Sequence, residues 1–84
     1  MKKRKILEKV LAGSRNVRFS EMTTLVQAFG FRLSRTNGSH HIFIHPEVRE
    51  MINLQEVNGK AKPNKIQQFL HLLERYNLEL GDEP

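Results

Sequence analysis

The residues best suited to chemistry stand in one short segment, Asn37-Gly38-Ser39-His40-His41. Histidine titrates near neutral pH and can exchange protons with a reacting oxygen, which contributes about 10²–10⁴-fold when it acts as a general acid or base. An arginine close by, such as Arg35, can hold a phosphate through two hydrogen bonds. These are the parts needed to cleave RNA. The competing interpretation is an ordinary hairpin turn followed by half-exposed strand histidines.

The remaining polar candidates give weaker signals. Lys60 and Lys62 precede a predicted helix N-terminus, where backbone N–H groups and the helix dipole favour a phosphate, but solvated loop lysines explain them equally well. His45 is interpreted as structural or solvated, and His71 as exposed. No pair of histidines or carboxylates has the spacing of a metal site, and the sequence has no cysteine, so we predict neither a metal nor a cofactor.

The elements that must position the histidines are two predicted strands. Residues 31–36 alternate with a period of two, Asn37-Gly38 is a hairpin turn signal, and residues 39–45 form the return strand before Pro46. With Asn37 and Gly38 as the loop, Leu33 faces Ile42, Phe31 faces Ile44 and Arg35 faces His40 on the core side. His41 and Phe43 then lie on the outer side, where Phe43 could stack on a base.

Three helices are predicted around this hairpin. Residues 2–12 form a short amphipathic helix with Ile6, Leu7, Val10 and Leu11 on its apolar side. Ser20 is the expected N-cap of a second helix, which ends at Gly30. Its apolar residues recur at the spacing of one buried stripe. Residues 51–57 form a third strand, and Pro63 begins the last helix. The apolar positions expected in the two longer helices are Met22, Leu25, Val26, Phe29, Ile66, Phe69, Leu70, Leu73 and Tyr76.

This order, α-α-β-β-β-α, predicts an α+β two-layer sandwich in which helices cover one face of a three-stranded antiparallel sheet. With 84 residues the chain is expected to form a single domain, residues 1–84. Its core would span about residues 20–78, and residues 1–19 would be an N-terminal helical extension. No apolar run is long enough for a transmembrane helix or signal peptide, so we expect a soluble cytoplasmic protein.

Charge is unevenly distributed along the chain. The formal net charge is +5, and residues 1–45 hold nine basic and two acidic side chains, a net +7. Residues 46–84 hold five basic and seven acidic ones, a net −2. The positive potential therefore belongs to the half of the chain that carries the histidine hairpin, which favours a polyanionic partner such as RNA.

The stretch from Phe31 to Pro46, preceded by an amphipathic helix that ends in Phe29-Gly30, resembles the HicA family of bacterial toxins. The shared pattern is a helix, a glycine with an aromatic residue, a strand, Gly-Ser-His-His, an aliphatic-aromatic pair and His-Pro. It covers about residues 20–78. The family comprises small mRNA interferases with a double-stranded-RNA-binding-like fold, and its members are paired with HicB antitoxins.

The resemblance implies an endoribonuclease toxin of a type II toxin–antitoxin system, active in stress responses, that cleaves mRNA without a metal and so inhibits translation. His40 matches the family's catalytic position, with His41 as the alternative. Arg35, Gly38, Ser39, Lys60 and Lys62 are the expected RNA-binding residues. The implied partners are mRNA and a HicB-like antitoxin, and direct DNA binding is not expected without that antitoxin.

Two functions of other classes stay open from the residues alone. A noncatalytic RNA-binding module would use the same basic half to grip the RNA backbone, with the histidines incidental. An interaction protein would instead pair an exposed sheet edge with a strand of its partner. RNA cleavage that depends on His40 would distinguish the ribonuclease from both of these alternatives.

Overall fold

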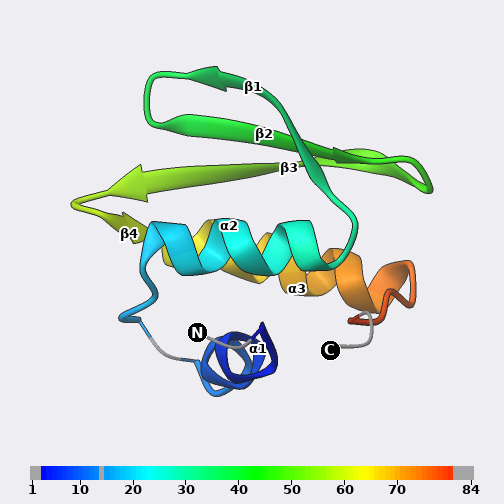
Figure 1. The fold of residues 1–84 in the computed structure, drawn as a ribbon, viewed down its shortest axis with the longest axis horizontal. Coiled ribbons are helices and arrows are strands. Elements are labelled where there is room, and N and C mark those ends of the chain that lie inside the picture. The colour runs from blue at the N-terminus through cyan, green and yellow to red at the C-terminus, as the bar shows by residue number, and fades with distance from the viewer. Residues whose placement is uncertain (1–2, 14, 81–84) are drawn as a thin grey trace.

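The computed structural model describes residues 3–13 and 15–80. Its sheet is antiparallel, with strand order β1-β2-β3-β4, and helices α2 and α3 cover one face of it (Figure 1). The predicted α+β class and the order of the elements are confirmed, and the short β4 adds a fourth strand to the three expected. The elements are α1 (Lys3–Leu11), α2 (Phe19–Ala28), β1 (Arg32–Asn37), β2 (His40–His45), β3 (Val48–Val57), β4 (Lys60–Ala61) and α3 (Pro63–Arg75).

Helix α2 begins earlier than the sequence predicts. Its N-cap is Arg18 and not Ser20. Glu21, the third helical residue, accepts a hydrogen bond of 2.9 Å from the backbone N–H of Arg18 through its carboxylate. This bond stabilises the first turn of the helix without a serine or threonine hydroxyl at the N-cap. The predicted apolar stripe is confirmed, because Met22, Leu25, Val26 and Phe29 are all buried.

The first hairpin has a different register from the expected one. Its loop is Gly38-Ser39, so Asn37 pairs with His40 and Arg35 pairs with Ile42, with a bulge at Ser34. The three predicted facing pairs, Arg35 with His40, Leu33 with Ile42 and Phe31 with Ile44, are therefore wrong. Ile44 pairs with Arg32 instead.

The two faces of the second strand are also exchanged relative to the prediction. Phe43 is 1% exposed and packs on the helix side, not on the outer side. His40 and Ile42 lie on the uncovered side, because neighbouring strand residues alternate between faces. This side of the sheet, which no described helix covers, is called the open face below.

Strands β3 and β4 are joined by a second tight hairpin. Asn58 and Gly59 both have positive φ, 54° and 78°, which is the geometry of the primed two-residue turn. Gly59 also accepts a hydrogen bond from the N–H of Phe19 at 2.9 Å, and Ala61 donates one to the carbonyl of Val17 at 3.0 Å. The chain before α2 is thereby fixed to the last strand.

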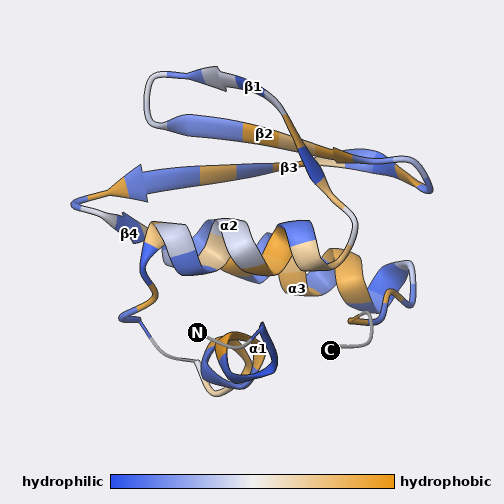
Figure 2. Cartoon of the chain, viewed as in Figure 1, coloured by the Kyte–Doolittle hydropathy of each residue, from blue (hydrophilic) through white to orange (hydrophobic). Residues whose placement is uncertain are grey.

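The core lies between the sheet and the two long helices. Ile52 and Leu54 contribute from β3, and Phe69 from α3 is fully buried. The spacing predicts burial of Leu70 and Leu73, but these two residues are only partly buried and Leu72 is buried instead. Apolar segments alternate with hydrophilic ones along β3 (Figure 2), as expected for a sheet with one covered face.

Helix α1 forms an additional layer beneath α2 and α3, on the side away from the sheet (Figure 1). Ile6 and Val10 are 1% and 2% exposed and belong to the same core, whereas Leu11 is 64% exposed and does not join the apolar side as expected. In the described ranges, no helix has the length and apolar character needed to cross a membrane.

Candidate functional site

His40 is the first residue of β2 and lies on the open face directly after the Gly38-Ser39 turn. Its Nδ1 is 3.1 Å from the Oδ1 of Asn53 on β3. A carbonyl oxygen only accepts, so this contact places a proton on Nδ1. In the neutral ring the Nε2 atom then keeps its lone pair, as a general base requires.

A shallow hollow of about 620 Å³ on the open face is lined in part by His40. The guanidinium-bearing Arg35 comes from the neighbouring strand, so the structure brings together a predicted catalytic residue and a predicted phosphate contact. The hollow is lined by Arg35, Thr36, Asn37, His40, Ile42 and Asn53.

His41 lies on the opposite face of the sheet. Its ring centroid is 4.6 Å from that of Phe19 at the start of α2, and its Nδ1 is 3.3 Å from the carbonyl oxygen of Ser39. The adjacent histidines are thus separated by the pleat of the strand: His40 faces the hollow, while His41 packs and holds the turn.

The turn residues Gly38 and Ser39 are exposed at the rim of the sheet. Gly38 has φ +62° and no heavy atom within 4 Å of the position that a Cβ would take, so its backbone is open to a large ligand. The carbonyl of Ser39 accepts a hydrogen bond of 3.0 Å from the N–H of Glu56. The turn is therefore anchored to β3 while its outer side stays free.

The two predicted lysine contacts lie at the other edge of the sheet and do not line the hollow. Lys60 pairs with Val57 in β4, and Lys62 is the N-cap of α3. The N–H of Lys62 donates to the carbonyl of Gln55, the residue paired with His40, so two strand spacings separate Lys62 from His40 across the sheet. An extended strand of RNA would have to cross β3 to reach both.

Charge is segregated between the two faces. By strand register, Arg32, Arg35 and Lys60 fall on the open face. The acidic strand residues fall on the helix face, where Glu50 accepts hydrogen bonds from Arg75 and Tyr76 at 2.7 and 3.2 Å. Within the described strands the open face therefore carries basic side chains and no acidic ones, which suits a polyanion.

His45 at the end of β2 has structural contacts. Its Nε2–H donates to the carbonyl of Phe29 at 3.1 Å, and its Nδ1 accepts from the N–H of Glu47 at 3.0 Å. Its ring also lies 4.9 Å from that of Phe31. Both nitrogens are occupied, so His45 fixes the end of α2 to the sheet and has no nitrogen left for a substrate.

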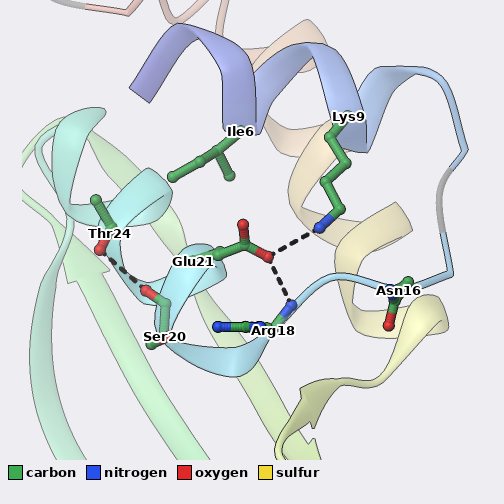
Figure 3. A pocket seen from close by; sticks show the side chains of 7 residues that line it. All are labelled: Ile6, Lys9, Asn16, Arg18, Ser20, Glu21 and Thr24. Carbon is green, nitrogen blue, oxygen red and sulfur yellow. Dashed lines mark hydrogen bonds and ion pairs between the residues drawn. The ribbon is translucent and has the colours of Figure 1, made fainter. Parts of the chain in front are cut away.

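A second hollow lies between α1 and α2, away from the open face (Figure 3). Glu21 dominates it: its side chain is only 10% exposed, and Oε1 meets Lys9 Nζ at 3.0 Å. The hydrogen bond from the Arg18 backbone N–H, aided by Lys9, lowers the pKa of Glu21 although burial opposes this shift. Because this carboxylate already joins the two helices, we read the hollow as structural.

Asn53 is the site residue that sequence reasoning missed. An asparagine within a strand has no motif of its own, and its relation to His40 depends on the register of β2 against β3, in which Asn53 pairs with Ile42. No cluster of three or more histidine, cysteine, aspartate or glutamate side chains that could hold a metal occurs in the part of the chain that the structure describes.

The fold and the site define a small α+β domain that presents a histidine hairpin on an uncovered, basic sheet face. Residues 19–59 match the family model described as HicA toxin of bacterial toxin-antitoxin, and they contain α2, the hairpin and β3. These residues form a HicA toxin family domain, which confirms the resemblance drawn from the sequence. Comparison with the curated proteins and with the solved structures finds no significant match.

Proposed function

We propose that this protein is the toxin ribonuclease of a toxin–antitoxin pair, which cleaves mRNA with His40 as general base and so stops translation in the cytoplasm. The observation that carries the proposal is the position of the His40 ring. It lines a hollow on a basic face, its Nδ1 is held by Asn53, and its Nε2 makes no hydrogen bond with a described residue.

The proposed reaction uses the ribose as its own nucleophile. Nε2 of His40 takes the proton of a 2′-hydroxyl, and the 2′-oxygen attacks the adjacent phosphorus. The bond between phosphorus and the 5′-oxygen breaks, and that oxygen takes a proton from water. The hydroxide so formed takes back the proton held on His40, which restores the base. The products are a 2′,3′-cyclic phosphate and a 5′-hydroxyl end. Since the nucleophile belongs to the RNA, the route requires no metal-bound water.

The remaining predicted residues bind RNA in this proposal. Arg35 contacts the phosphate beside His40, and the backbone of Gly38 and Ser39 approaches the RNA at the rim. Lys60 and Lys62 contact phosphates further along the strand. His41, the alternative catalytic residue, is assigned to packing because its ring lies against Phe19 on the other face.

The partners follow from the family domain. A HicB-like antitoxin, encoded beside this chain, would bind the toxin and block RNA cleavage. A search for a small antitoxin-like reading frame next to the gene tests this part, and co-expression should restore growth to cells that produce the toxin.

The catalytic assignment is tested with purified protein and a labelled RNA in the presence of EDTA. We expect fragments with 5′-hydroxyl ends from the wild type, a rate lower by about 10²–10⁴-fold for His40→Ala, and a milder loss for His41→Ala at equal folded fraction. Equal cleavage by His40→Ala would refute the assignment. Salt-sensitive binding of RNA whose length never changes would instead indicate the noncatalytic RNA-binding module.

A further inference from the structure

We infer that the hollow on the open face holds one unpaired nucleotide, the one on the 5′ side of the cleaved bond, and that Asn37 selects its base. The inference rests on the proposed ribonuclease function and adds a specificity-determining residue to it. Nothing in the catalytic step itself requires Asn37, so the two can be tested separately.

The position of Asn37 is the first argument. It pairs directly with His40 across the β1–β2 ladder, and its side chain lines the hollow. Residues directly opposite in such a ladder have Cα atoms about 4.5–5.5 Å apart. A ribose whose 2′-hydroxyl meets His40 therefore carries its base within reach of Asn37.

The second argument is that the Asn37 side chain is not used by the fold. Asn53 is engaged with His40, whereas the Asn37 side chain makes no hydrogen bond with any described residue. Its φ is not positive, unlike that of Asn58, so the turn does not require asparagine here. A side-chain amide with one acceptor and two donors is thus left in the hollow for a ligand.

The rest of the hollow suits a nucleotide in three ways. Ile42 is a half-buried apolar residue on which a base face can rest, and Arg35 supplies a positive charge for the phosphate. His40 meets the ribose between them. A base reaches such a surface only when it is unstacked and unpaired, which is how proteins read RNA sequence.

The chain offers a matched control in Gln55. It also pairs with His40, from the strand on the other side, and it carries the same amide group, but it does not line the hollow. The experiment maps cut sites of wild type, Asn37→Ala and Gln55→Ala on one RNA of random sequence, by sequencing the fragment ends.

We expect the wild type to prefer one base 5′ of the cut by about 5- to 150-fold, the discrimination of a good amide–base pair. Asn37→Ala should reduce that preference to near unity by slowing cuts at the preferred base, while cuts at the other bases persist. Gln55→Ala should keep the preference. An unchanged preference in Asn37→Ala, or an equal loss in Gln55→Ala, would overturn the inference and leave the ribonuclease proposal intact. A wild type that cuts no RNA would overturn both.

Discussion

Replacing Asn53 by leucine tests whether the position of the His40 ring matters for catalysis. Leucine is close to asparagine in size, and the site is half-buried on the open face beside Ile42, so the change removes the 3.1 Å contact and roughly preserves the volume of the side chain. One such hydrogen bond contributes about 0.5–1.5 kcal/mol net. At about 1.36 kcal/mol per factor of ten, we expect cleavage to slow by about 2- to 13-fold.

The assay is single-turnover cleavage of a labelled RNA, with the folded fraction of each variant measured by circular dichroism. Gln55→Leu is the control, since Gln55 is on the same strand and the same face but its side chain makes no hydrogen bond with His40. Because Asn53 is assigned to act only through His40, the double variant His40→Ala/Asn53→Leu should be no slower than His40→Ala alone. Full wild-type activity in Asn53→Leu, or independent losses in the double variant, would refute the reasoning.

Two further predictions concern stability. Glu21→Gln should destabilise the protein by about 0.5–1 kcal/mol near neutral pH. Because the pKa of Glu21 is lower in the folded state, the ionised carboxylate stabilises the fold at any pH above its ordinary pKa of 4.5. This contribution is lost as the pH falls through the folded pKa. The free energies of unfolding of variant and wild type, measured by urea titration, should therefore converge in acid. Gly30→Ala should unfold at a lower denaturant concentration than Gly13→Ala. Both glycines have positive φ, but only at Gly30 would a Cβ approach His45, at 2.9 Å from its Nε2. Equal losses of stability in the two variants would contradict this contact.

The helices could be predicted because their spacing decides which side is buried. Met22, Leu25 and Val26 follow one another at helical intervals, and all three are fully buried. The start of the helix was less predictable, since a glutamate that caps from the third position competes with a serine at the cap, and Arg18 rather than Ser20 is the cap. Helix ends depend on one hydrogen bond, whereas helix faces depend on many contacts.

The hairpin register could not be predicted, because it depends on a bulge. Asn37-Gly38 is a good turn signal, but the loop is one residue later, and the extra residue Ser34 in β1 absorbs the difference. A shifted register moves side chains to the other face, and this is why Phe43 is buried and His40 is not. Arg35 and His40 still share one face of the sheet, as predicted, because both side chains lie on the open face and not on the helix side.

The open face explains why this chain needs its extra helix. A sheet that keeps one face uncovered can bury apolar residues only on the other, which limits the core of an 84-residue chain. Helix α1 adds burial on the far side of the helix layer through Ile6 and Val10, and Phe69 of α3 packs on the rings of Phe29 and Phe31 at 5.7 and 6.1 Å. The segment that matches the family carries the candidate site, while the flanking helices complete its core, so the face around His40 can stay uncovered without loss of the fold.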